Sequence, residues 1–276
     1  MTYRFLLFQL FCCICITTVQ AQHAGRIEQT VTCNGVSVQL VAEVPAADTV
    51  DVLLAYHGTV LFDSKILEAA RNMLGQVKRI TDRKDILLVS VAYPEEGLLM
   101  GDNIREAEAA LLWVRQHGAA EWKRVIRKVF LVGHSQGGYL VTRLNTLHTT
   151  DGVIANAPGP LNMELRCQLE EDGRVSPAGD HCRLLRERYG PVRSNPGPYL
   201  ERSLLSFTSG FKAPILFVQG LNDSRIQLTS WPRFRQQVEA CTNCAERRFL
   251  EIPGAGHGAL FQDAAARRVY NAFLNR

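Results

Sequence analysis

The sequence predicts an α/β fold in which helices cover both faces of a mostly parallel central sheet. Short apolar segments rich in β-branched residues recur along the chain without polar alternation, as expected of strands covered on both faces. Segments with apolar residues at spacings of three and four lie between most of them, which is typical of helices. The length of 276 residues and the hydrophobic content of 46% suit one large domain.

The start of the chain has the features of a secretory signal peptide over residues 1–21. Arg4 precedes an apolar run, and small Ala21 ends the polar stretch that follows it, so we expect cleavage after Ala21. The apolar run is shorter than the roughly 20 residues of a membrane span. We therefore expect an exported chain, periplasmic or secreted, with no membrane span after cleavage. Bulky Phe11 directly before Cys12 disfavours the alternative of a lipoprotein.

The remaining residues, 22–276, are expected to form the α/β domain. Residues 26–32 and 36–44 alternate apolar and polar side chains, and Asn34-Gly35 between them suits a tight hairpin turn, so an antiparallel pair should open the sheet. The buried strands are then predicted at residues 50–56, 86–92, 128–132, 152–157, 214–219 and 247–252.

Helical patterns are predicted at residues 64–80, 102–117, 136–147 and 263–274, with a further helix opening at Ser230-Trp231-Pro232. Asp102 is the expected N-cap of the second helix and Gly118 its stop. One segment breaks the alternation of strands and helices. Residues 158–212 separate two strands by far more than a helical crossover needs, so we expect a cap insertion over the sheet rather than a second domain.

Five cysteines remain after removal of the predicted signal peptide. Export permits disulfides, and Cys167 and Cys182 are the first expected pair because they lie in the same irregular segment. Cys241 and Cys244 could close a tight loop; zinc is the alternative for this pair, although no second pair lies nearby in the sequence. Cys33 is left as a buried thiol.

The charge pattern gives no indication of a nucleic-acid partner. The 31 basic and 27 acidic side chains leave a net charge of +4, and the basic residues are scattered instead of clustered. No glycine-rich dinucleotide turn follows the first predicted parallel strand, so we expect no cofactor. We expect no metal site either. The sequence leaves the oligomeric state open.

The clearest chemical motif is Gly133-His134-Ser135-Gln136-Gly137, which fits the pattern G-x-S-x-G. A buried strand precedes it and a helical pattern follows it directly, so Ser135 should lie on a sharp strand-to-helix turn. Glycines two positions before and after the serine leave room for the neighbouring chain. The start of a helix favours developing negative charge. We therefore predict that Ser135 is a nucleophile.

A serine nucleophile needs a general base, and His257 is the candidate. It follows the last predicted strand in the glycine-rich loop of residues 253–258, which should place it at the carboxyl edge of the sheet, where α/β sites form. The other histidines are expected to serve elsewhere. We expect His134 to turn away from the serine, His181 to be exposed in the insertion, and His57 to brace a loop.

The base in turn needs an acid that orients it, and Asp223 follows a strand at the same edge. Asp151 is the rival, but it precedes its strand and so belongs to the opposite edge. The oxyanion formed during acyl transfer needs two backbone N–H donors. We expect them to be the amide of Gln136 and that of Thr59 in the turn after the first parallel strand, with Val60 as the runner-up.

Taken together, these residues resemble the α/β-hydrolase superfamily over essentially the whole mature length. The order Ser135, Asp223, His257 is similar to that superfamily's order of nucleophile, acid and base. The His57-Gly58 turn resembles its oxyanion turn, and the insertion lies where it carries a cap. The resemblance implies the α/β-hydrolase fold and a serine hydrolase activity.

Within the superfamily, the chain looks most like small secreted esterases and the catalytic domains of prolyl-oligopeptidase-type enzymes. It lacks the His-Gly-Gly-Gly stretch of the hormone-sensitive-lipase type, and it has Gln136 where many peptidase-type members carry Tyr or Met.

Three hypotheses of function follow. The first is hydrolysis of a small-molecule carboxylic ester through an acyl-enzyme. The second is cleavage of a short peptide by the same residues, and the third is an inactive binding protein on the same fold. Because all three predicted triad members are present, the third is disfavoured. The insertion and residues 98–100 are expected to shape a moderately apolar pocket for a small acyl group.

Overall fold

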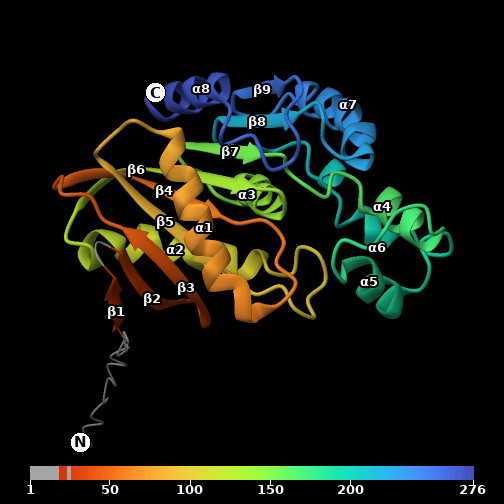
Figure 1. Cartoon of the computed structure of the whole chain (residues 1–276), viewed down its shortest axis with the longest axis horizontal. Coiled ribbons are helices and arrows are strands. Elements are labelled where there is room, and N and C mark those ends of the chain that lie inside the picture. Colours follow the sequence, from red (N-terminus) through yellow and green to blue (C-terminus); the bar gives the residue numbers. More distant parts are fainter. Residues whose placement is uncertain (1–18, 24–25) are drawn as a thin grey trace, which may run out of the picture.

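The computed structural model describes residues 19–23 and 26–276 (Figure 1). Its strands are β1 (Val19–His23), β2 (Arg26–Cys33), β3 (Val36–Glu43), β4 (Thr49–Tyr56), β5 (Ile86–Ala92), β6 (Val125–His134), β7 (Gly152–Asn156), β8 (Ile215–Gly220) and β9 (Arg247–Ile252). Its α-helices are α1 (Ile66–Val77), α2 (Ile104–Glu121), α3 (Gln136–Leu147), α4 (Met163–Glu171), α5 (His181–Tyr189), α6 (Gly197–Leu200), α7 (Arg225–Glu239) and α8 (Ala264–Leu274). Short 3-10 turns are η1 (Asp63–Lys65), η2 (Lys78–Ile80) and η3 (Leu204–Ser206).

These strands form one sheet in the order β1-β2-β3-β5-β4-β6-β7-β8-β9. Strands β4 to β9 pair in parallel, whereas β1, β2 and β3 pair antiparallel and β3 joins the rest through β5. Asn34 and Gly35 turn the β2–β3 hairpin with φ of 51° and 76°, the left-handed conformation that a two-residue hairpin turn requires. The predicted mostly parallel sheet with an antiparallel N-terminal hairpin is therefore confirmed.

Helices cover both faces of this sheet, as predicted. Successive side chains of β4 point to opposite faces: Leu54 joins a cluster with α2 and α3, whereas Leu53 joins a cluster with α1 and α8. Residues 50–56 are fully buried, which explains why their sequence shows no polar alternation. The site at the edge of the sheet therefore rests on a core packed from both sides.

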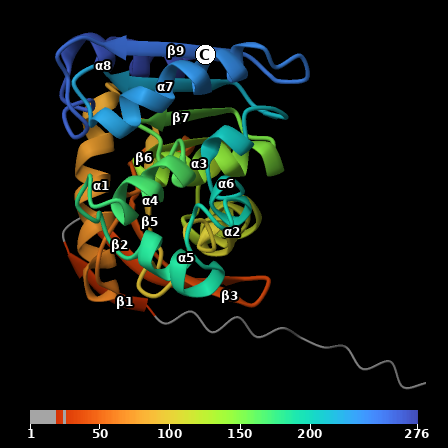
Figure 2. The same cartoon turned by 90° about the vertical axis from the view of Figure 1, so that its right-hand side faces the viewer.

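The cap insertion leaves the sheet after β7 and returns at β8. It carries α4, α5 and α6, which lie beyond the arrowheads of β7 and β8 in Figure 1 and in front of the sheet in Figure 2. A disulfide between Cys167 and Cys182 joins α4 to α5, and a second, between Cys241 and Cys244, closes the loop after α7. Both expected pairs are thus present, the second in place of the zinc alternative, and Cys33 is a buried thiol.

The boundaries of helices α2 and α7 differ from those predicted. Helix α2 continues through Gly118 because this glycine serves packing and not termination: a Cβ there would lie 2.7 Å from the ring of Trp122. Its N-cap is Asn103 rather than Asp102. Helix α7 begins at Arg225 and contains Pro232. The hydroxyl of Ser224 accepts a hydrogen bond from the amide of Gln227 and caps the helix six residues before Ser230, where it was expected to open.

The predicted signal peptide lies mostly outside the described residues. Strand β1 begins at Val19 and pairs with β2, so the expected cleavage after Ala21 would fall within this strand. None of the helices in the described part of the chain is both long and apolar enough to cross a membrane.

Removal of the cap disulfide should destabilise the protein. The Cys167→Ala/Cys182→Ala variant is expected to lose about 3 kcal/mol of unfolding free energy, because the bridge spans 15 residues and restricts the unfolded chain. Urea denaturation measures the loss. The matched control, Cys241→Ala/Cys244→Ala, opens a span of 3 residues and should cost about half as much. Equal losses in the two variants would contradict the loop-length argument.

Candidate active site

The backbone at Ser135 has φ 56° and ψ −117°, a conformation that side-chain-bearing residues rarely adopt. The turn is possible because two glycines allow close approach. A Cβ at Gly133 would lie 2.0 Å from the carbonyl oxygen of Gly137, and a Cβ at Gly137 would lie 2.0 Å from that of Tyr56. Ser135 is thereby held between the end of β6 and the first residue of α3, on the wall of a cavity.

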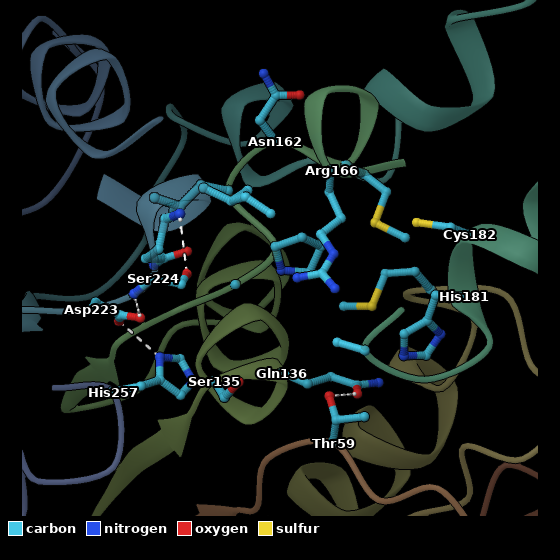
Figure 3. A pocket seen from close by; sticks show the side chains of 18 of the residues that line it. Thr59, Ser135, Gln136, Asn162, Arg166, His181, Cys182, Asp223, Ser224 and His257 are labelled. Carbon is cyan, nitrogen blue, oxygen red and sulfur yellow. Dashed lines mark hydrogen bonds and ion pairs between the residues drawn. The ribbon is translucent and has the colours of Figure 1, made fainter. Parts of the chain in front are cut away.

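His257 and Asp223 reach the same cavity from two other strand ends. Nδ1 of His257 donates a hydrogen bond of 2.8 Å to Oδ2 of Asp223, which leaves Nε2 as the acceptor nitrogen of the neutral ring. Figure 3 shows the imidazole between the carboxylate of Asp223 and Ser135. The structure therefore brings together the three residues that the sequence singled out.

The side chain of Asp223 is only 1% exposed, yet it remains suited to carry a negative charge. Burial raises the pKa of this carboxyl, but the hydrogen bond and charge of His257 together with hydrogen bonds from Gln219 and the Ser224 amide outweigh burial, so the net pKa is lowered. An ionised Asp223 fixes the tautomer of His257 and stabilises its protonated form.

The rivals of these residues lie elsewhere. The carboxylate of Asp151 accepts a hydrogen bond from the Val129 amide at the opposite edge of the sheet. His57 is buried and stacks on Tyr93, with ring centroids 4.2 Å apart, and its Nδ1 bonds to the Gly58 carbonyl, so it braces the turn. Burial lowers the pKa of His57 to about 4 and keeps it neutral.

His134 lies closer to the site than its expected orientation implied. Its ring centroid is 4.9 Å from that of His257 and 5.9 Å from that of Phe261. Burial, and then the charge of His257, lower the pKa of His134 to about 4. A neutral His134 therefore forms part of the packing around the ring of His257.

The amides near the expected oxyanion position are not equally free. Val60 N donates to Oε2 of Glu95 at 3.0 Å, so the runner-up donor is already used. The Thr59 amide has no acceptor among residues 19–23 and 26–276, and Thr59 lines the cavity together with Ser135 and Gln136. This geometry favours Thr59 over Val60 as the second donor.

Sequence reasoning missed the buried carboxyl group beneath this turn. The side-chain amide of Gln136 is oriented with its nitrogen toward Glu95. The nitrogen lies 3.1 and 2.8 Å from the two carboxyl oxygens of Glu95 and 2.9 Å from Thr59 Oγ1, and donates to them. The side-chain oxygen accepts a hydrogen bond from Asn103. Glu95 thus links the Val60 turn to Gln136. Its place just after the carboxyl end of β5 was the signal that could have found it.

The cavity has a volume of about 520 Å³ and extends from Ser135 and His257 to the cap. Met100 lines it, from the stretch predicted to do so. His181 was expected to be exposed, but its side chain lies in the cavity wall and both ring nitrogens are inaccessible to solvent. The Cys167–Cys182 bridge explains the difference, because it holds the first turn of α5 against α4.

The site offers no obvious metal centre. In the part of the chain that the structure describes, no group of three or more His, Cys, Asp or Glu side chains is placed to hold an ion.

Comparison with known proteins identifies the fold. No protein-family model and no curated protein matches the chain. Among solved structures, the Est2 esterase of Thermogutta terrifontis is similar at 19% identity and a TM-score of 0.61, over 91% of this chain and 94% of that one. A Rhizomucor miehei esterase is similar at 14% identity and a TM-score of 0.65, over 94% of this chain and 82% of that one. An acylaminoacyl peptidase is similar at 14% identity and a TM-score of 0.60, over 91% of this chain and 40% of that one.

At these identities the likeness establishes the architecture. Together with the sheet order and the cap between β7 and β8, it shows that the chain has the α/β-hydrolase fold.

Glu95 should make stability depend on pH. Burial, with a smaller contribution from Asp63, raises the pKa of this carboxyl from 4.5 to about 8, against the opposing hydrogen bond from Val60. The native state therefore holds a proton that the unfolded chain has lost, and the free energy of unfolding falls as pH rises from about 4.5 to about 8. Between these two pH values, the free energy of unfolding of wild type should fall by on the order of a few kcal/mol more than that of Glu95→Gln.

Denaturant unfolding at several pH values measures this difference. The same substitution at exposed Glu96 is the matched control. Parallel stability curves for wild type and Glu95→Gln would contradict the assigned role of the buried carboxyl.

Proposed function

We propose that the protein is an exported serine hydrolase that cleaves a carboxylic ester through an acyl-enzyme. The observation that carries the proposal is the placement of Ser135, at a strained helix start, in one cavity with the hydrogen-bonded His257 and Asp223. The esterases among the structurally similar proteins support it.

The proposed reaction begins when Oγ of Ser135 attacks the ester carbonyl carbon and passes its proton to Nε2 of His257. The carbonyl oxygen becomes an oxyanion, which the amides of Thr59 and Gln136 stabilise. The bond to the alcohol oxygen then breaks, and His257 donates its proton to the leaving alcohol. Asp223 orients the imidazole and stabilises its charge throughout.

Water then hydrolyses the acyl-enzyme, with His257 again acting first as base and then as acid. His257 removes a proton from the water as it attacks the acyl carbon, and the bond to Ser135 breaks as the proton returns to Oγ. The products are a carboxylic acid and an alcohol, and the free enzyme is restored.

A peptidase is the second candidate, because the acylaminoacyl peptidase has a similar fold. The share of each similar protein that this chain covers favours ester hydrolysis over peptide cleavage. The similarity spans 94% and 82% of the two esterase chains but 40% of the peptidase chain. An inactive binding protein is the weakest candidate, since all three proposed triad residues are present in the sequence and line one cavity.

Export is proposed from residues 1–21, whose basic start and short apolar run are typical of a signal peptide. The two disulfides are compatible with an oxidising compartment. N-terminal sequencing of the mature protein tests this, and a mature chain that still begins at Met1 would refute it.

Loss of the nucleophile should abolish turnover. Ser135→Ala is expected to lower kcat/KM on 4-nitrophenyl butyrate on the order of 10⁴-fold, because no covalent intermediate can form. The matched control is Ser37→Ala, on an exposed position of β3, which should retain wild-type activity. A Ser135→Ala variant with unchanged turnover would refute the mechanism.

Matched substrates separate the ester from the peptide hypothesis. We expect hydrolysis of 4-nitrophenyl butyrate without detectable cleavage of butyryl 4-nitroanilide or of a panel of N-acylated dipeptides. Absorbance and chromatographic assays of the same preparation give the comparison. Faster cleavage of the amides than of the ester would transfer the proposal to a peptidase.

A further inference from the structure

The carboxylate of Asp223 has a second side-chain donor besides His257. Nε2 of Gln219 donates a hydrogen bond of 3.0 Å to Oδ2 of Asp223, the same oxygen that accepts from Nδ1 of His257. The backbone amide of Ser224 donates to the other oxygen, Oδ1, at 2.6 Å. The carboxylate, whose bond to His257 is drawn in Figure 3, is therefore held by three donors.

The side chain of Gln219 is itself held by a second amide. Gln219 lies in β8, four residues before Asp223, and is fully buried. Its side-chain oxygen accepts a hydrogen bond of 3.0 Å from Nε2 of Gln227, in the first turn of α7. Gln227 is 8% exposed, and its Nε2 also donates to the carbonyl oxygen of Pro158 at 2.9 Å. These two side chains, the glutamine pair, therefore connect the start of the cap insertion to the carboxylate.

The groups at the two ends fix the orientation of the glutamine pair. A carboxylate and a backbone carbonyl only accept hydrogen bonds, so the nitrogen of Gln219 must face Asp223. The nitrogen of Gln227 must face Pro158 for the same reason. Gln219 also donates to the carbonyl oxygen of Gly220 at 2.9 Å, so both glutamines use both of their N–H groups. Neither amide can therefore turn over without leaving buried polar atoms unpaired, which folded proteins avoid.

We propose that Gln219 is a positioning residue for the proposed triad acid and that Gln227 holds it in place. This inference rests on the proposed acyl-enzyme reaction, in which Asp223 orients His257. The terminal torsion of an aspartate side chain is broad, so it does not by itself fix which oxygen faces the imidazole. The bond from Gln219 keeps Oδ2 directed at Nδ1 of His257 and stabilises the negative charge of the carboxylate.

The alternative role of the glutamine pair is to anchor the cap to α7. Only the bond from Gln227 to Pro158 reaches the cap insertion, and a purely structural anchor does not need the further bond from Gln219 to Asp223. The two roles differ in what they predict. If the pair positions the acid, the effect of changing Gln227 passes through Gln219; if it anchors the cap, the effect is independent of Gln219.

Replacing Gln219 with methionine removes the donor to Asp223. Methionine is similarly long and flexible but cannot donate a hydrogen bond from its side chain. Gln219→Met is expected to lower kcat on 4-nitrophenyl butyrate by about tenfold to a hundredfold, because a hydrogen bond to a charged group is lost, and to leave KM little changed. Gln236→Met, at an exposed position of α7, is the matched control and should retain the wild-type kcat.

A double-mutant cycle tests whether Gln227 acts through Gln219. Gln227→Met alone is expected to lower kcat about threefold, since it removes the neutral hydrogen bond that holds Gln219. Added to Gln219→Met, the same change should cause no further loss, because residues that act as one unit are not additive. An equal loss in both backgrounds would assign Gln227 to the cap and overturn its part in positioning the acid.

Nuclear magnetic resonance separates failure of this inference from failure of the proposed function. The ¹⁵N chemical shifts of labelled histidine report which ring nitrogen of His257 carries the proton when the ring is neutral. We expect Nδ1 to carry it in wild type and in Gln236→Met, and a partial transfer of the proton to Nε2 in Gln219→Met. This measurement needs no turnover, so it decides the positioning role even if wild type cleaves no ester. Identical His257 shifts in wild type and Gln219→Met would overturn the inference, as would an unchanged kcat in an active enzyme.

Discussion

The strand-to-helix turn at Ser135 is the constraint on which the rest of the site depends. A left-handed backbone at a residue with a side chain persists only where the surrounding structure holds it. Here Gly133 and Gly137 allow β6, α3 and the end of β4 to approach within distances that any Cβ would block. The same close approach sets the Gly58 turn against Ser135, since a Cβ at Gly58 would lie 3.3 Å from that of the serine. Ser135 and the turn proposed to hold the oxyanion are therefore parts of one packing arrangement.

Parallel strand order explains why residues distant in sequence meet at this turn. Thr59 follows β4, Glu95 follows β5, Ser135 follows β6, Asp223 follows β8 and His257 follows β9. All of these strands present their carboxyl ends at one edge, which is where α/β folds place their ligands. The cap then closes this edge from above, and its disulfide fixes the two helices that complete the cavity.

Features that a short stretch of sequence encodes were predictable, whereas features that depend on distant packing were not. The strands, the hairpin turn and helix α3 could be read from local composition, and Ser135 from its strand-turn-helix context. The pairing of Asp223 with His257 followed from their positions after neighbouring strands. Gly118 gave a false helix stop because its role is contact with Trp122, four residues on at the C-cap of the helix. The inward position of His181 depends on a disulfide and on the sheet edge beneath it, and neither is visible in the residues around it.

The central claim is that Ser135 is an activated nucleophile, and covalent labelling tests it most directly. The native protein would be treated with a fluorophosphonate, digested, and analysed by mass spectrometry. The account predicts one adduct per chain, located on Ser135, and loss of labelling in His257→Gln. No adduct, or an adduct on Ser224, which lines the same cavity, would contradict it.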